Sequence, residues 1–263
     1  MKRTIWVTVA MAAMLGIAGA GGAHELILKP EKMEAPKGSS VALEVQSTHK
    51  FVVPEEMEDV SVMKAGVFRN GALEPIELKG NEPKLRIDSS FAVADDGTML
   101  VLCEKRPAKP YSRTNQGAKN GTRKELEAQG LKVVSSIKYE KFAKVIVNAK
   151  AGDANFATVV GQELEIVPIT NPADIKVGGY ADFKVIFKGQ PTSVPVWATY
   201  DGFCPEYENT YAFYSEGGND GVVHVKITHP GFWMVRAMTN DPAGVAGEYD
   251  SRQLRSVLTF LVK

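Results

Sequence analysis

The segments ELILKP (residues 25–30) and VALEVQ (residues 41–46) decide the fold that we expect. In the first, the polar residues Glu25 and Lys29 flank the apolar row of Leu26 and Leu28. In the second, the row of Val41, Leu43 and Val45 alternates with Glu44 and Gln46. A period of two is the pattern of a β-strand with one buried face. The two segments therefore predict two half-buried strands, and the connection from Pro30 to Ser39 would allow them to pair antiparallel.

Similar short segments recur along the whole chain. Turn sequences such as Arg69-Asn70-Gly71 and Asp95-Asp96-Gly97 separate them, so the chain as a whole is expected to be all-β. Further strands are expected at residues 60–68, 84–87, 99–103, 133–137, 144–148, 164–168, 182–187, 194–200, 221–227, 232–238 and 256–262.

One short helix interrupts this pattern. Thr122 followed by Glu125 is a capping-box sequence, and Gly130 supplies a stop, so a helix is expected between them. The preceding stretch, residues 106–121, is polar, basic and contains glycine and proline. It predicts a long loop.

The strand pattern divides near residue 162. We expect two antiparallel β-sandwich domains, residues 24–161 with the helix inserted and residues 162–263. The second has the strand spacing of an immunoglobulin-like sandwich, with Asp220-Gly221 and Pro230-Gly231 as turns.

The amino terminus has the pattern of a secretory signal peptide. Lys2 and Arg3 precede an apolar run, and small residues follow it, so residues 1–23 are expected to be removed during export to the periplasm. Cleavage after Ala23 would make His24 the first residue. Cleavage after Ala20 would leave His24 as the fourth residue, and cleavage after Gly21 would leave it as the third.

Composition excludes some partners. Loss of Lys2 and Arg3 leaves 29 basic and 31 acidic side chains, a net charge of −2, so nothing favours nucleic acid. No later apolar run could cross a bilayer, so the processed chain is not expected to be membrane-embedded. For Cys103 and Cys204, export makes a disulfide the first expectation, and unpaired thiols are the alternative.

The histidines suggest a metal site. A terminal His24 offers an α-amine and an imidazole on one residue, which can chelate a divalent transition ion. His24 extends the row of Leu26 and Leu28, and His49 extends the apolar row of the second segment. Antiparallel pairing would place the two rings opposite each other. A site of nitrogen ligands suits Ni(II), Co(II), Cu(II) or Zn(II).

Other residues near these positions have weaker claims. His49 could instead be an ordinary half-buried histidine, and Glu55 and Glu56 could be carboxylate ligands or a solvated loop. His229 precedes a turn and is a minor candidate ligand. His224 falls on the outward face of a strand. No catalytic motif or cofactor fingerprint is present, so an enzyme is not expected.

Five segments occur in order along the chain: THKF (48–51), KYEKFAK (138–144), GQELEIVP (161–168), FKGQP (187–191) and PGFW (230–233). Together they resemble a bacterial exported family that is labelled as a periplasmic component of a cobalt or nickel transport system, similar to NikK- and NikM-like accessory proteins. The resemblance implies nickel or cobalt handling, with His24 as the histidine after the signal peptide. It also implies that His49 belongs to a GHxF-like segment with Thr48 in place of glycine, and that Tyr139 and Lys144 fall in a shared segment of unassigned role.

The expected function is therefore capture of a divalent metal, nickel or cobalt first and copper second, and its delivery to a membrane uptake transporter. The alternatives are a metal-free adhesion or carbohydrate-binding sandwich and a copper-dependent oxidative enzyme. Thermal stability that does not change when nickel, cobalt, copper or zinc is added would favour the metal-free module, because an ion that binds the folded state raises its stability. Oxygen- or peroxide-dependent turnover identifies the second.

Overall fold

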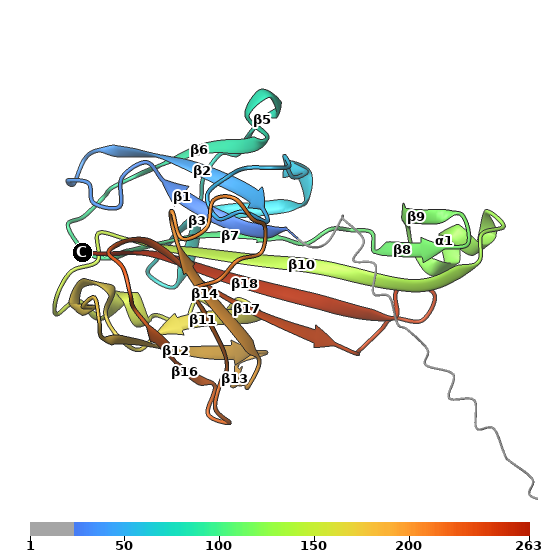
Figure 1. Ribbon diagram of the computed structural model, residues 1–263. Coiled ribbons are helices and arrows are strands. Elements are labelled where there is room, and N and C mark those ends of the chain that lie inside the picture. The colour runs from blue at the N-terminus through green and yellow to red at the C-terminus, as the bar shows by residue number, and fades with distance from the viewer. Residues whose placement is uncertain (1–23) are drawn as a thin grey trace, which may run out of the picture.

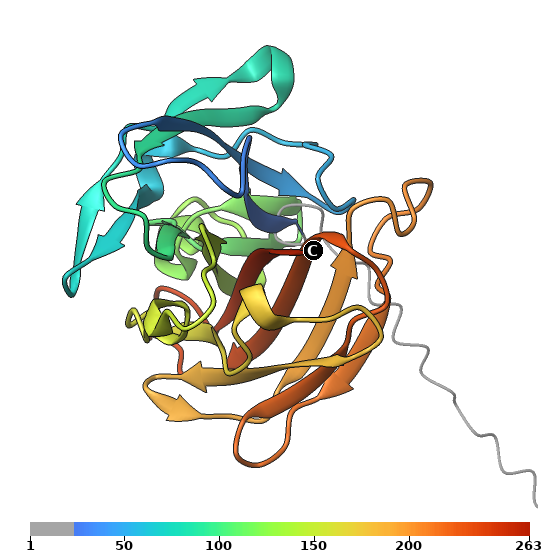
Figure 2. The ribbon, with the colours of Figure 1, turned by 90° about the vertical axis from the view of Figure 1, so that its left-hand side faces the viewer.

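A computed structural model describes residues 24–263, so the predicted signal peptide and its cleavage sites lie outside the described residues. The chain forms three stacked layers of β-sheet, as Figure 1 shows. The end-on view in Figure 2 separates the layers, with the central sheet between the other two. The predicted all-β sandwich is confirmed.

The first layer contains the amino-terminal strands. Its first two strands pair antiparallel, with Glu25 opposite Thr48 and Leu28 opposite Val45. The layer contains, in spatial order, β1 (Glu25–Pro30), β2 (Ser40–Thr48), β6 (Arg86–Ala92) and β5 (Lys79–Asn81).

The central sheet runs across the expected boundary near residue 162. Its main path follows the order β15 (Phe213–Glu216), β14 (Pro195–Tyr200), β17 (Gly231–Asp241), β18 (Ser251–Val262), β10 (Val133–Val147), β7 (Met99–Lys105), β3 (Met63–Arg69) and β4 (Ala72–Pro75). Strands β10 and β18 pair in parallel, where the strand pattern predicted antiparallel pairing alone. The division into domains stays a prediction, and one continuous sheet crosses it.

The third layer packs on the opposite face of the central sheet. It contains β11 (Leu164–Pro168), β12 (Tyr180–Phe187), β13 (Gln190–Pro191) and β16 (Val222–Lys226). Short 3-10 helices connect the strands at Val60–Val62, Glu82–Lys84, Ala154–Ala157 and Pro172–Asp174.

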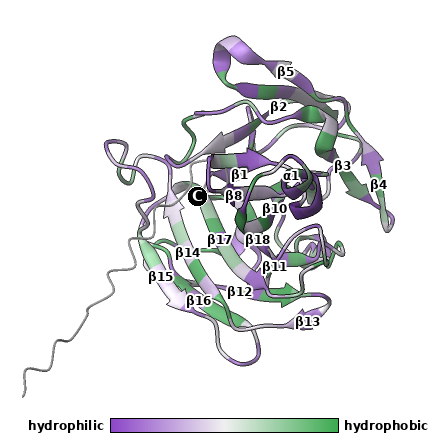
Figure 3. Ribbon diagram, turned by 90° about the vertical axis from the view of Figure 1, so that its right-hand side faces the viewer, coloured by the Kyte–Doolittle hydropathy of each residue, from purple (hydrophilic) through white to green (hydrophobic). Residues whose placement is uncertain are grey.

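Two hydrophobic cores lie on the two faces of the central sheet. Successive residues of a strand point to opposite faces, so Val101 and Val145 join the first core while Leu102 and Ile146 join the second. In Figure 3 the helix α1 (Arg123–Ala128) is coloured as hydrophilic, whereas strands such as β14 and β17 carry hydrophobic residues. The central sheet is therefore a layer of both sandwiches, one on each of its faces.

Lys144 is a buried charge on the face that meets the second core. Its ammonium donates to Glu165 at 2.5 Å and to the carbonyl of Ile166 at 3.2 Å. Glu165 also accepts the backbone N–H groups of Val160 and Gly161. Both contacts of the Lys144 ammonium cross from the central to the third layer, so Lys144 has a structural role.

A lobe projects from the far ends of β10 and β18 (Figure 1). It carries α1, whose capping box between Thr122 and Glu125 is formed as predicted. The predicted long loop at 106–121 is wrong, because β8 (Tyr111–Thr114) and β9 (Gly117–Asn120) form a hairpin there. The predicted strands 133–137 and 144–148 are parts of the single strand β10.

The two cysteines are free thiols, so the expected disulfide is wrong. Cys103 faces the first core, and burial raises the pKa of its thiol. Cys204 lies partly exposed in the loop after β14. Within residues 24–263, no helix has the length and apolar character to cross a membrane.

Candidate metal centre

The pairing of β1 with β2 brings His24 and His49 together. Glu25 is opposite Thr48, so the same register extended by one residue sets His24 opposite His49. Their ring centroids are 3.9 Å apart, with the ring planes inclined by 44°. The predicted meeting of the two imidazoles is therefore present.

A tight turn after β2 returns the chain to these rings. The turn closes by a hydrogen bond from the Val53 N–H to the Lys50 carbonyl, and Val52 has a φ of 61°. That left-handed conformation is unfavourable for a β-branched residue. The N–H groups of Glu55 and Glu56 then donate to the Ser47 carbonyl at 3.0 and 3.3 Å. The turn thus places both carboxylates beside the histidines.

Glu55 contacts both imidazoles. Its Oε2 lies 2.8 Å from His49 Nδ1 and 3.4 Å from His24 Nε2, and it also accepts the backbone N–H of His49 at 3.1 Å. A carboxylate on one ring nitrogen fixes the tautomer and leaves the other nitrogen as an acceptor. Glu55 therefore orients His49 with Nε2 available, and it approaches His24 on the ring nitrogen opposite Nδ1.

The Nδ1 atom of His24 is buried without a hydrogen-bond partner. Glu56 Oε2 lies 3.0 Å from it, but the two atoms are not aligned for a hydrogen bond. Buried polar atoms in folded proteins nearly always have a partner. This nitrogen is also the one that can close a chelate ring with the α-amine of the same residue.

The surroundings of the site favour a neutral His24 ring and an ionised Glu55 carboxylate. Burial lowers the pKa of His24, and His49 and Lys141 lower it further against the opposing effect of the two glutamates. For Glu55, burial raises the pKa, but hydrogen bonds from the His49 side chain and backbone outweigh it, so the net shift is downward. At neutral pH the imidazole lone pairs of His24 are therefore free to bind a cation.

The segment that carries the glutamates is anchored by Glu58. This carboxylate accepts from Ser47 Oγ at 2.9 Å, from Lys141 at 2.7 Å and from Lys105. Burial alone would raise the pKa of Glu58, but the two lysines lower it to about 2. No local sequence pattern indicates this cluster, because Lys141 lies 83 residues away from Glu58.

The start of β1 is anchored on its other face. Glu25 points away from the histidines and lies 2.6 Å from Arg236 Nε and 2.8 Å from an Arg255 guanidinium nitrogen. The side chain of Glu25 is only 4% exposed. This ion pair fixes the residue next to His24 in the sequence.

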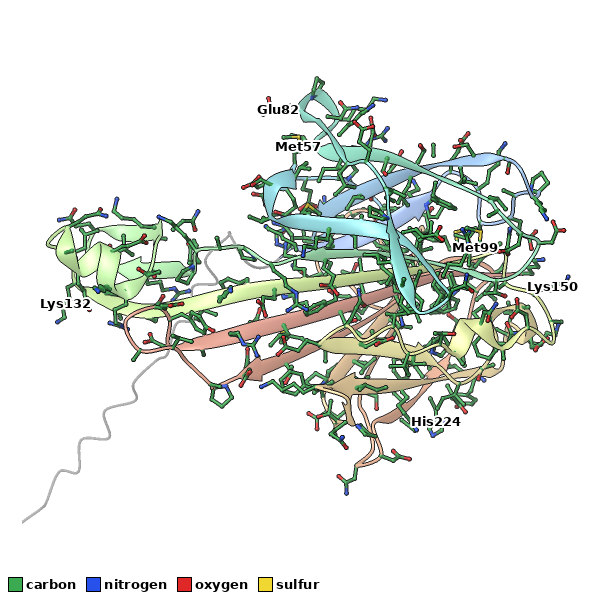
Figure 4. All side chains as sticks on the ribbon, turned by 180° about the vertical axis from the view of Figure 1, so that it is seen from behind. Met57, Glu82, Met99, Lys132, Lys150 and His224 are labelled. Atoms are coloured by element: carbon green, nitrogen blue, oxygen red, sulfur yellow. The ribbon has the colours of Figure 1, made fainter. Side chains whose placement is uncertain are left out.

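The remaining histidines lie outside the site. Among the described residues, the group able to hold an ion comprises His24, His49 and Glu55 and does not include His229. The ring of His229 stacks on Tyr200 at 4.7 Å, and its carbonyl accepts from Trp233 Nε1 at 2.9 Å. His224 lies on the outer face of the third sheet, as Figure 4 shows, 2.7 Å from Asp182. Its solvent-facing placement agrees with the strand pattern.

Comparison with solved structures finds distant likenesses. The human OSCAR ligand-binding domain is 10% identical, with 90% of this chain and 98% of that chain covered and a TM-score of 0.24. The D0-D1 domain of intimin is 11% identical over 90% and 98%, with a TM-score of 0.22. The Yersinia pseudotuberculosis adhesin InvE is 13% identical over 92% and 61%, with a TM-score of 0.21. Likenesses this weak carry no conclusion about function.

No curated protein matches the chain. One family model does match it, over residues 22–241, and so covers most of the sequence, including β1, β2 and the histidine pair. The chain belongs to the family described as a domain of unknown function, DUF4198.

Proposed function

We propose that this protein is an exported, periplasmic metal-binding protein that captures a divalent first-row ion and delivers it to an uptake system without catalytic turnover. Nickel or cobalt is the favoured cargo, and copper is the second choice. The observation that carries the proposal is the buried Nδ1 of His24, which has no hydrogen-bond partner and stands beside a second imidazole.

The donor set follows from the contacts. After cleavage behind Ala23, His24 would supply its α-amine and Nδ1, and His49 would supply Nε2. Glu56 Oε2, 3.0 Å from His24 Nδ1, would supply an oxygen. Adjacent ligands of one ion, each about 2 Å from it, stand roughly 3 Å apart. Glu55 would then act behind the ligands, by orienting both rings.

This donor set supports the choice of cargo. Imidazole and amine nitrogens suit nickel, cobalt, copper and zinc, while hard cations such as magnesium prefer oxygen. The side chain of Glu56 is 50% exposed, whereas that of His24 is 12% exposed. A site with one solvent-facing ligand can exchange its ion, as a carrier must.

Equilibrium dialysis of the secreted protein against Ni(II), Co(II), Cu(II) and Zn(II) tests the proposal, after intact-mass measurement has established the terminal residue. We expect retention of about one ion, lost in His49→Ala and kept in His224→Ala. The second variant is a matched control, because it also removes a histidine paired with a carboxylate.

A variant with one alanine inserted before His24 tests the terminal amine, since it moves the α-amine away from the imidazole. We expect it to fold normally and bind at least tenfold more weakly. A protein that begins at His24 and retains none of these ions, with unchanged thermal stability in their presence, would refute the proposal and favour the metal-free adhesion module.

A further inference from the structure

A large cavity adjoins the candidate metal centre. It has a volume of 660 Å³ and lies where the projecting lobe joins the first sandwich, between residues 56–62, residues 105–111 and the middle of β10. Cavities of roughly 300–1,000 Å³ are typical of small-molecule sites. The alternation of β10 directs Tyr139 and Lys141 to this face, while Lys144 points to the other.

The wall of the cavity has more hydrogen-bond donors than the protein satisfies. Lys141 is 3% exposed, and an ammonium carries three N–H donors. Among residues 24–263, its hydrogen-bond acceptor is Glu58 Oε1. Buried donors left without acceptors are costly, so a ligand with several acceptor oxygens fits this wall.

Other groups around the cavity can bind the same kind of ligand. Lys109 adds a cation at the rim, where its contact with Glu125 is exposed to solvent. The phenol rings of Tyr111 and Tyr139 meet edge to face, with centroids 6.2 Å apart, and both line the cavity. Phenol and ammonium groups together suit a small carboxylate.

The cavity and the metal centre share a wall. Glu56 lines the cavity and lies 3.0 Å from the unpartnered Nδ1 of His24. The charge of Lys141 also reaches His24. A molecule in the cavity would therefore be beside the proposed ligands, and its oxygens could fill positions around the ion that the protein leaves open.

We propose that the cavity binds a small carboxylate chelator, so that the cargo of the protein is a metal–chelator complex rather than a bare ion. This inference rests on the proposed function, since it names the form in which the metal arrives.

Citrate is the probe. The processed protein is titrated with nickel chloride and with preformed nickel citrate, and citrate retained after gel filtration is counted as labelled carbon. We expect citrate and nickel to be retained in about equal amounts. Ala108→Trp, which fills the cavity from its exposed rim, should weaken nickel citrate binding by about tenfold or more and leave nickel chloride binding within about twofold.

Lys109→Gln is expected to weaken nickel citrate binding in the same selective way. Its control is Lys132→Gln, an exposed lysine at the tip of the lobe in Figure 4, which should change neither titration. Nickel retained without citrate, or an Ala108→Trp protein that binds nickel citrate as well as the wild type, overturns the inference and leaves the metal site standing. Retention of neither nickel form by protein that begins at His24 overturns the proposed function as well.

Discussion

Replacement of Glu58 by glutamine should destabilise the fold strongly at neutral pH. The side chain of Glu58 is 5% exposed and accepts hydrogen bonds from Lys105 and Lys141. The two lysines lower its pKa from 4.5 to about 2. At 1.36 kcal/mol per pKa unit, ionised Glu58 contributes about 3 kcal/mol to the free energy of unfolding. Removing one partner of a buried ion pair costs a similar amount, about 3–5 kcal/mol.

The sign of the pH dependence follows from the direction of the shift. Because the folded-state pKa lies below the unfolded value of 4.5, the contribution is complete above that pH and is lost as the pH falls toward about 2. The cost of Glu58→Gln should therefore be about 3 kcal/mol at pH 7 and about 1 kcal/mol at pH 3. Urea unfolding followed by tryptophan fluorescence measures it at both values.

Asp59→Asn is the matched control, since it removes the same charge from the adjacent, exposed residue. Asparagine can still accept the Ser61 N–H that Asp59 accepts at 2.9 Å. We expect little change at either pH. A cost of Glu58→Gln below about 1 kcal/mol at pH 7, or the same cost at pH 3, would show that the lysines do not hold this carboxylate as described.

Three further outcomes are expected. Glu55→Gln should weaken nickel binding by roughly 10–100-fold in equilibrium dialysis without abolishing it, as is usual for a group that orients a metal ligand; complete loss would instead make Glu55 a ligand. Lys144→Met should lower the free energy of unfolding by about 3–5 kcal/mol in urea, because it leaves Glu165 buried without its cation; a neutral effect would contradict the pairing. In native protein, iodoacetamide should label Cys204 and spare Cys103, as mass spectrometry of peptides would show.

Local patterns predicted the parts of the fold that local chemistry controls. Alternation placed Leu26 and Leu28 in the first core, and the capping box at Thr122 formed a helix. The pairing of β1 with β2 was predictable because a short connection joins them and their buried faces fix the register. For that reason the meeting of His24 and His49 could be expected from the sequence.

Contacts between distant segments were beyond such patterns. Period-two alternation shows which face of a strand is buried, but it does not show which strand lies beside it. The parallel pairing of β10 with β18 could therefore not be predicted. The hairpin at 111–120 was missed because all residues of β9 are exposed and carry no apolar alternation. The buried lysines were missed because Lys141 and Lys144 find their carboxylates only in the folded chain.

The central sheet also has a consequence for how the protein unfolds. Strands β7 and β10 contribute alternate side chains to both cores. Unfolding of one sandwich would therefore remove part of the sheet against which the other core packs. We therefore expect the two sandwiches to unfold together, so that destabilising the third layer also lowers the protection of backbone amides around the histidines from hydrogen exchange. Such coupling would act through β7 and β10, the strands that both cores share.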